Sequence, residues 1–467
     1  MSYHIVRNTF YILLCVCGSF ATAGENLESA NTSEMPSGIL LQLQGGHSSP
    51  CLDSLPNSAV DLLDVVNLAL CNNPQTREVW ASTRAQIAQV EVSKAGYFPA
   101  INLNASVNRS KTENLPSEDR RSAGVTLSYL LYDFGSRSAN LENARQILAA
   151  TQAVQTSTIQ SVLLGAAQAF YQVQATLASL DAAIESEQVA RESLAAAQAR
   201  YDAGSATRAD ILQAQTAYSQ ATLNRISTDG KLKNEQGGLA NVIGLDANRK
   251  VLLIPANVAA IPADFEGNVA EMIEEARRMR PDYQAMAAQV KAAEASVDIA
   301  RSSGQPTVSL SAASNQINSS GINSNSSQLG INLNIPIFSG YSPTYRTQAA
   351  EAQVEAKAAQ MESLRLQISL DVWTAYQNLA TATQTIRTTA DFLDSAKHSE
   401  RVVIGRYKAG IGSILDVLSA QSTLANAQQQ RVQSLFNWNI SRTILAQSMG
   451  NLDIDLLNIL MPKSRTN

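Results

Sequence analysis

Charged and aromatic residues are scarce in this chain. Of its 467 residues, 16% are charged and 5% aromatic, and 35 Lys and Arg against 40 Asp and Glu leave a net charge of −5. No cluster of basic residues occurs that could neutralise the phosphates of DNA or RNA. We therefore expect no nucleic-acid partner.

The motifs of catalysis are also absent. The three histidines, His4, His47 and His398, do not have the spacing of metal ligands. No G-x-S-x-G, P-loop or G-x-G-x-x-G motif occurs. The sequence predicts no enzyme, no metal and no cofactor.

Cysteine is rare, and two of the four cysteines lie in a segment that has the form of a secretory signal. This segment has an apolar core over 10–20 followed by small residues suited to cleavage. Its apolar run is too short to span a bilayer. Neither Cys15 nor Cys17 follows the small residue that a lipid-anchored chain needs. We expect a signal peptide over 1–23, removed before Gly24, and no acyl anchor.

Cleavage would leave Cys51 and Cys71. Two cysteines in an exported chain are most simply a disulfide. The bridge would close a loop of about 20 residues, worth ~3 kcal/mol on the chain-entropy model. The alternative, a metal or redox role, lacks a C-x-x-C spacing and a neighbouring histidine.

The chain repeats itself at an offset of about 206 positions, which must be interpreted before any local motif. The run R-Y-D-A-G at 200–204 returns as R-Y-K-A-G at 406–410, and Asp210 and Asp416 each follow six residues after the glycine. Two copies of a long module suit a symmetric scaffold or conduit better than an enzyme.

Long helices account for most of the chain. From Arg137 to Arg200 there is no proline, and apolar and alanine positions recur at spacings of three and four. Unbroken, this helix would be ~95 Å long. Further helices are expected at about 60–95, 206–243, 266–302, 344–408 and 412–449.

Four segments alternate with period two instead: 100–108, 122–132, 307–314 and 328–338. Each is close to the ~9–11 residues of a tilted transmembrane strand, and one apolar face opposite one polar face is typical of a membrane barrel. The alternative is a pair of ordinary hairpins packed on a soluble core. Four strands cannot close a barrel, so their edges would be exposed in lipid. Three chains would supply twelve strands, and a dimer would leave little room for large cargo.

These signals divide the chain into successive segments. A hairpin returns to the side of the membrane from which it came, so all helices are expected on one side. The expected segments are a signal peptide (1–23), an irregular segment (24–58), a first repeat (59–265) with a hairpin at about 99–133 and a turn at 201–206, a second repeat (266–450) with a hairpin at about 306–338 and a turn at 407–412, and a tail (451–467).

The combination resembles the TolC family of outer-membrane efflux proteins over essentially the whole mature chain. The resemblance is carried by the two R-Y-x-A-G turns, the stretch 413–418, the Tyr-Asp-Phe-Gly run at 132–135 and Asn73-Pro74. It implies a mainly α fold with a membrane β-barrel. A trimeric outer-membrane barrel, with four strands from each protomer, would continue into a long periplasmic α-helical barrel.

The resemblance also implies partners and a function. The homotrimer would dock onto a periplasmic adaptor protein and an inner-membrane transporter, either ABC or proton-driven, in the cell outer membrane. The Cys51 and Cys71 pair and the run 70–74 are similar to members that serve type I protein secretion. Drug or small-molecule efflux is the alternative, and a trimeric coiled-coil surface adhesin is a further one. An adhesin anchor would lie at one terminus, whereas these hairpins interrupt the chain twice.

In the family, charged residues just after the second turn line the periplasmic entrance and hold it shut. Carried over to this sequence, the gate candidates are Tyr407, Gly410, Asp416, Asp210, Tyr201 and Gly204. Gly412 stands where members often have Arg, and Ser419 where a second Asp would continue an acidic ring. A gate locked through that Arg is therefore in doubt.

Local physics offers another role for the two aspartates. Thr207 with Asp210, and Ser413 with Asp416, fit helix capping boxes. The glycines of the turns would then end the long helices in left-handed conformation. Both roles can coexist in a trimer.

Aromatic residues gather near the ends of the predicted strands. At the periplasmic boundary they would form an interfacial girdle between lipid and water. The alternative is plain packing at the junction of sheet and helices. The girdle candidates are Phe98, Tyr132, Phe134 and Phe338.

Overall fold

The computed structural model describes residues 59–111, 113, 117–254, 268–319 and 322–452. The expected signal peptide, the irregular segment 24–58 with Cys51, and the tail from 453 lie outside the described residues. The described residues belong to one compact unit, which falls within residues 51–467.

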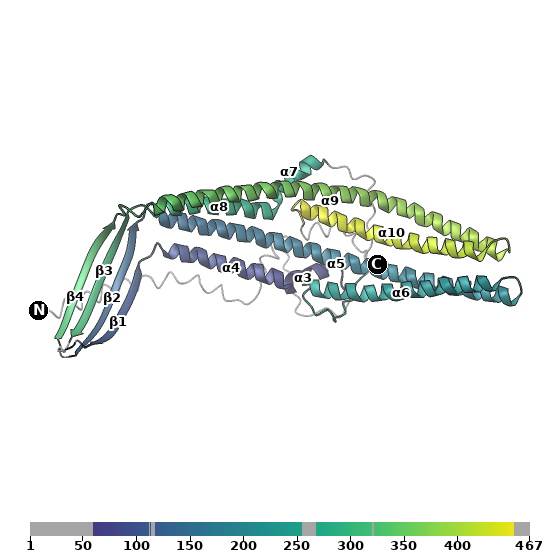
Figure 1. Ribbon diagram of the computed structural model, residues 1–467, viewed down its shortest axis with the longest axis horizontal. Helices are drawn as coiled ribbons and strands as arrows, with labels where there is room; N and C mark the ends of the chain where they lie inside the picture. Colours follow the sequence, from purple (N-terminus) through teal and green to yellow (C-terminus); the bar gives the residue numbers. More distant parts are fainter. Residues whose placement is uncertain (1–58, 112, 114–116, 255–267, 320–321, 453–467) are drawn as a thin grey trace, which may run out of the picture. The chain divides into compact units, whose positions relative to one another are not determined.

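Two long helices of 67 residues each, α5 (Ser136–Asp202) and α9 (Ser342–Lys408), run the length of the helical part (Figure 1). Each turns back into an antiparallel partner, α6 (Arg208–Val242) or α10 (Ile414–Ser448). Beside them lie α3 (Leu62–Asn72), α4 (Pro74–Ala95), α7 (Val269–Met279) and α8 (Pro281–Ser302). None of these eight helices combines the length and apolarity needed to cross a membrane.

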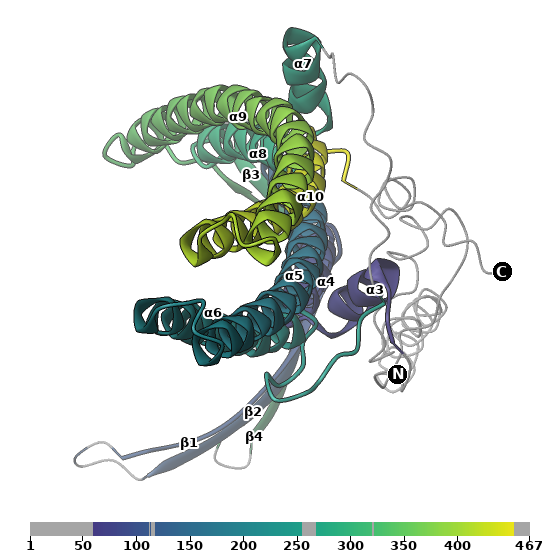
Figure 2. The ribbon, with the colours of Figure 1, turned by 90° about the vertical axis from the view of Figure 1, so that its right-hand side faces the viewer.

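The neighbours of each helix define two layers that share α5 and α9. Near the sheet the order is α4, α5, α8, α9, and near the turns it is α6, α5, α10, α9 (Figure 2). Two short helices pack on the outside of these layers: α3 packs on α5, and α7 packs on α9. The largest fully buried side chains lie chiefly where α3 meets α5, among them Leu62, Leu68, Leu163 and Phe170.

The predictions of single helices over 60–95 and 266–302 were wrong, because each is broken once. The breaks fall at Asn73 and Arg280, which have extended backbone with ψ of 127° and 123°. Each precedes a proline, which disfavours helical geometry in the residue before it. The proline then starts the next helix, where its missing N–H costs nothing.

The strands form one antiparallel sheet in the order β1-β2-β3-β4. Their bounds are β1 (Ala100–Ser110), β2 (Glu118–Tyr132), β3 (Thr307–Ser319) and β4 (Ile322–Asn334). The predicted continuation of the last strand to 338 was wrong. Pro336 has no N–H to donate, so the ladder ends at Asn334.

The register places the apolar residues of all four strands on one face. Leu103 is paired with Val125, Leu127 with Ala312, and Leu310 with Ile331. Residues paired directly across strands point to the same side of a sheet. Leu103 is 77% exposed and Leu329 is 76% exposed, so no other part of the described chain covers this face. An apolar face of this extent is suited to lipid.

Both edges of the sheet are open. β1 pairs only with β2, and β4 only with β3, within the described chain. Unpaired backbone groups in lipid cost several kcal/mol each, so strands that span a membrane must close on themselves. The sheet therefore requires further strands at both edges.

Candidate functional site

The two turns that join α5 to α6 and α9 to α10 lie at the end of the helices remote from the sheet (Figure 1). Gly204 and Gly410 are left-handed, with φ of 72° and 80°. The N–H groups of Ser205 and Ile411 donate to the carbonyls of Arg200 and Arg406 across the helix ends. These are the glycine-ended helices that the repeated sequence predicts.

Capping boxes begin both return helices. Asp210 Oδ2 accepts from the Thr207 N–H at 2.7 Å, and Asp416 Oδ2 accepts from the Ser413 N–H at 3.2 Å. The two aspartates therefore satisfy N–H groups that the helix leaves free. Asp416 stays exposed to solvent, so capping does not remove its charge from the surface.

A contact between the two repeats joins the turns. Arg200 Nη1 donates to the Tyr407 carbonyl at 2.8 Å, and its guanidinium lies 4.4 Å from the centre of the Tyr407 ring. The Tyr407 hydroxyl is buried and has no hydrogen-bond partner among the described residues. The structure thus brings Tyr407 to Arg200, and no hydrogen bond in the described chain joins Tyr407 to Asp210 or Asp416.

Arg200 and Tyr407 join the end of α5 to the end of α9, and two more polar contacts join α5 to α10. Gln421 Nε2 donates to Ser193 Oγ at 2.8 Å, and Gln428 Nε2 donates to Glu185 Oε2 at 3.3 Å. We call these three contacts, with Arg200 to Tyr407 as the outermost, the clasp. It fastens the α5–α6 hairpin to the α9–α10 hairpin.

The sequence did not reveal the clasp. Arg200 is in the repeated motif, but its counterpart Arg406 makes no side-chain contact of this kind within the described ranges. Tyr201, the counterpart of Tyr407, is exposed. The contact of α5 with the α9–α10 hairpin is what sets Arg200 apart from Arg406. A Cβ at Gly412 would lie 3.0 Å from the Tyr407 backbone nitrogen, so the turn is closed tightly at this position.

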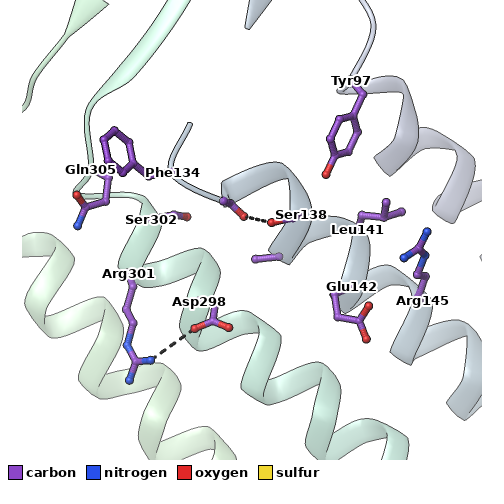
Figure 3. A pocket seen from close by; sticks show the side chains of 12 residues that line it. Tyr97, Phe134, Ser138, Leu141, Glu142, Arg145, Asp298, Arg301, Ser302 and Gln305 are labelled. Atoms are coloured by element: carbon purple, nitrogen blue, oxygen red, sulfur yellow. Dashed lines mark hydrogen bonds and ion pairs between the residues drawn. The ribbon is translucent and has the colours of Figure 1, made fainter. Parts of the chain in front are cut away.

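At the other end of the helices, Arg137 ties the sheet to α5. Its Nε donates to Asp133 Oδ2 at 3.0 Å and its Nη1 donates to the Leu130 carbonyl at 2.8 Å, while its guanidinium lies 5.0 Å from the Tyr97 ring. Asp133 is buried. A cavity lies beside this junction, between the ends of α4, α5 and α8 (Figure 3).

The four girdle candidates lie at the same junction. Phe338 is 76% exposed and Phe98 is 61% exposed. The Tyr132 and Phe134 rings are 4.8 Å apart, edge to face. These side chains contact one another or their neighbours and still present a surface outward, so packing and a girdle remain compatible.

Midway along the helices, α6 and α10 each end at a glycine that is packed on a helix break. A Cβ on Gly244 would lie 2.5 Å from the Asn72 carbonyl oxygen, and one on Gly450 would lie 2.9 Å from the Arg280 nitrogen and Cα. Asn73 Nδ2 donates to the Val242 carbonyl at 3.0 Å. The repeat therefore builds the same glycine contact twice.

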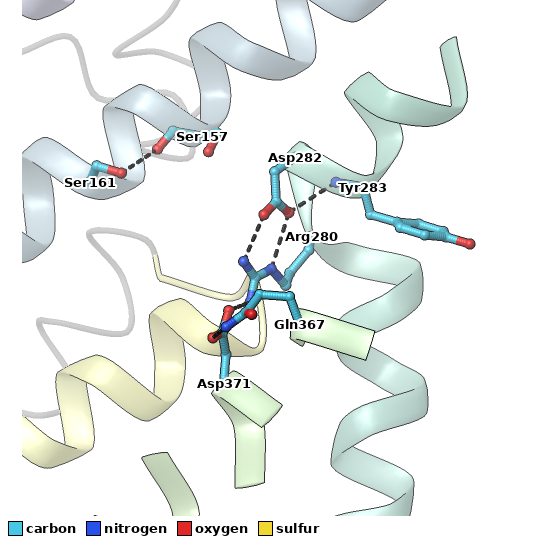
Figure 4. Close-up of polar contacts among 7 residues, drawn as sticks. All are labelled: Ser157, Ser161, Arg280, Asp282, Tyr283, Gln367 and Asp371. Atoms are coloured by element: carbon cyan, nitrogen blue, oxygen red, sulfur yellow. Dashed lines mark hydrogen bonds and ion pairs between the residues drawn. The ribbon is translucent and has the colours of Figure 1, made fainter. Parts of the chain in front are cut away.

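The second glycine contact carries a charge network that the first does not have among the described residues (Figure 4). Arg280 forms ion pairs with Asp282 at 2.6 Å and with Asp371 of α9 at 2.9 Å. Burial lowers the pKa of the Arg280 guanidinium, but the hydrogen bonds and charges of Asp282 and Asp371 raise it by more, so the net shift is upward. Gln367 also donates to Asp371, at 2.7 Å. The network binds the α7–α8 break to α9.

Comparison with known proteins identifies this arrangement. The model of the family "Outer membrane efflux protein" matches residues 65–245 and 272–451, which covers both repeats. The chain belongs to this family. It is 31% identical to protein CyaE of Bordetella pertussis over 392 residues, 82% of each chain. It is 24% identical to the outer membrane protein TolC of Vibrio cholerae over 403 residues, 84% of this chain and 91% of the relative.

A solved structure of another outer-membrane channel has the same fold. The outer-membrane channel OprN superposes with a TM-score of 0.74 at 19% identity, over 84% of this chain and 90% of that one. The predicted fold class, an α-helical barrel with a membrane β-barrel, is confirmed.

This outer membrane efflux protein is an exit duct of tripartite export systems in the cell outer membrane, with its helices in the periplasm. Channels of the family are trimers that work with adaptors and inner-membrane transporters. The sheet thus lies in the membrane, and the turns with the clasp lie at the periplasmic end.

The predicted disulfide is covered only in part by the described residues. Cys71, at the end of α3, is disulfide-bonded. Cys51 lies outside the described residues, so the pairing of the two stays a prediction. The bonded cysteine lies next to Asn72, whose carbonyl packs on Gly244.

Proposed function

We propose that three copies of this chain form the exit duct of a type I protein-secretion system and pass a protein from an inner-membrane transporter to the exterior. The proposal that the cargo is a protein rests on Cys71, which is disulfide-bonded. Cys71 lies in the run 70–74, which resembles the corresponding run of family members that serve type I secretion. The partners are a periplasmic adaptor and an ABC transporter. The duct has no enzymatic activity, since it supplies a path and no chemistry.

The open edges of the protomer support the trimer. β1 and β4 end the sheet, α4 and α9 end the layer next to it, and α6 and α9 end the layer at the turns. Exposed apolar side chains lie on these outer helices, including Leu223 and Ile226 on α6 and Leu366 and Leu370 on α9. Three copies would pair every edge and give a barrel of twelve strands.

A deletion strain tests the cargo class. In the producing bacterium, loss of the gene is expected to remove one or more proteins from the culture medium, and the wild-type gene is expected to restore them. Drug susceptibility should change little. If drug susceptibility rises while the secreted proteins are unchanged, the duct serves small-molecule efflux and the protein cargo is wrong.

The clasp supports a gate at the periplasmic entrance, formed by Tyr407, Gly410 and Asp416 with Asp210, Tyr201 and Gly204 of the first repeat. For the entrance to widen, the α9–α10 hairpin must move away from α5. The contacts of Arg200 with Tyr407 oppose that movement. Arg200 is therefore part of the gate, together with the residues of the turns.

Replacing Arg200 by alanine is expected to favour the open duct. A hydrogen bond from a charged group contributes about 1.5–3 kcal/mol, so its loss should shift the open-to-closed ratio by roughly tenfold or more. Single-channel recording in planar bilayers measures the ratio. Arg406→Ala, at the equivalent position of the second turn, is the matched control and should leave it unchanged. Equal behaviour of the two variants would remove Arg200 from the gate.

Asp416 needs a separate test, because it caps α10. Asp416→Asn keeps a side-chain oxygen for the cap and removes the negative charge. A gate role predicts weaker block by divalent cations added on the periplasmic side, by several-fold, with unchanged thermal unfolding. Unchanged block would leave Asp416 with the capping role alone.

A further inference from the structure

The cavity at the sheet–helix junction, which we call the junction cavity, has a volume of about 780 Å³ (Figure 3). It lies at the point where the chain passes from membrane to periplasm. Two aromatic rings and four charged side chains contribute to its wall: Tyr97, Phe134, Glu142, Arg145, Asp298 and Arg301. The four formal charges cancel.

The junction cavity opens on the side of the helices that carries α3 and α7. Glu142 and Gln160 of α5 are 18 positions apart (160 − 142), which is five turns of about 3.6 residues and places them on one face. Gln160 donates to the Gly450 carbonyl at 2.8 Å. On α8, Asp298 is also 18 positions (298 − 280) from Arg280, on which Gly450 packs. Both helices therefore turn their cavity residues toward the side where the chain leaves α10 (Figure 2).

The junction cavity belongs to the middle of a protomer. It is lined mainly by α5 and α8, which are the two inner helices of the layer next to the sheet. The helices that a neighbouring copy would contact, α4 and α9, lie on either side. The cavity thus remains accessible from the membrane interface in a trimer.

The charged side chains that line the cavity differ in how many ion pairs and hydrogen bonds they form. Arg301 forms ion pairs with Glu351 at 2.9 Å and with Asp298 at 3.5 Å. Arg145 has no hydrogen bond or ion pair within the described chain. Side chains of a helix lean toward its N-terminus, and the N-terminus of α5 is at the sheet. Glu142 and Arg145 therefore lean toward the membrane.

We propose that the junction cavity binds the headgroup of a zwitterionic phospholipid, a phosphodiester joined to a primary ammonium, from the periplasmic leaflet. Arg145 supplies the donors for the phosphate. Glu142, one turn away, and Asp298 on the facing helix accept from the ammonium. The acyl chains lie along the exposed girdle candidates, including Phe98 and Phe134.

Charge complementarity selects this headgroup over its competitors. An anionic headgroup would pair with Arg145 and leave Glu142 facing it without a counter-charge, since Arg301 already pairs with Asp298. A metal cation or polyamine would pair with the carboxylates and leave Arg145 unpaired. Only a group with both charges satisfies both sides.

Native mass spectrometry of the full chain in detergent tests the proposal, with added phosphatidylethanolamine and with phosphatidylglycerol of the same acyl chains. The wild type is expected to bind phosphatidylethanolamine more tightly. Arg145→Gln should weaken that binding by about tenfold, the loss of one charged hydrogen bond, and Glu142→Gln should remove the preference over phosphatidylglycerol. Arg191→Gln, farther along α5, is the control and should bind as the wild type does.

Several results would overturn the site. Unchanged lipid binding in both cavity variants would do so, as would a wild-type preference for phosphatidylglycerol. Soluble glycerophosphoethanolamine, which has the headgroup without acyl chains, should not displace the lipid at equal concentration. Displacement would show that a free phosphate ester, and not a lipid, is the ligand. None of these results bears on export, which is measured separately.

Discussion

Replacing Gly450 by alanine is expected to lower the free energy of unfolding by about 2–5 kcal/mol. The φ of 79° at this position costs an L-residue about 1–2 kcal/mol. In addition, the new Cβ would lie 2.9 Å from the nitrogen and Cα of Arg280, which are backbone atoms at a helix break. The α7–α8 break would have to move away from α10. Thermal unfolding of the purified protein, followed by circular dichroism, measures the loss.

The first repeat offers an equivalent variant, and a glycine of α9 offers a control variant. Gly244→Ala has the same φ of 79° and a still closer contact, 2.5 Å to the Asn72 carbonyl oxygen, so it should destabilise at least as much. Gly405→Ala, in the last turn of α9, meets no atom within 4 Å and should be neutral or stabilising by up to ~1 kcal/mol. If all three variants unfold alike, the glycine contacts do not hold the helices together.

Replacing Arg280 by alanine is expected to destabilise by about 2–4 kcal/mol, because it leaves two carboxylates without their counter-charge. The Arg280 side chain is 11% exposed, and its partners Asp282 and Asp371 are about one-third exposed. Solvent at the carboxylates screens part of the loss, so the lower half of this range is favoured. The same thermal unfolding measurement applies.

Two further variants separate the network from its surroundings. Arg278→Ala removes an exposed arginine two residues away and should change stability by no more than ~0.5 kcal/mol. Combining Arg280→Met with Asp371→Leu replaces this ion pair by apolar groups and should recover part of the loss. A double variant as unstable as Arg280→Ala alone would show that the unpaired charge of Asp371 is not the cause of the loss.

Most of the fold could be predicted from the sequence, because the patterns that mark helices and strands lie within short stretches of the chain. Period-two alternation located the strands, and the absence of proline located the long helices. The breaks at Asn73 and Arg280 were missed although the following prolines were visible, since the helical pattern continues on both sides. The end of β4 was missed in the same way at Pro336.

The functional contacts were less accessible from the sequence. The capping boxes of Asp210 and Asp416 are local and could be predicted. The clasp depends on α5 packing against α10 and on Arg200 differing from Arg406 in its surroundings, which no pattern within one helix encodes. The junction cavity likewise arises where three helix ends meet, and Arg145 has no distinguishing neighbours in the sequence.

The mass of the protein extracted from outer membranes in mild detergent tests the central claim most directly. The open edges of β1 and β4 predict an assembly of three copies, because only closure of the sheet satisfies the edge strands in lipid. Light scattering during size-exclusion chromatography gives the mass without the detergent. A mass of three chains agrees with the duct described here, and a stable monomer or dimer in the outer membrane would contradict it.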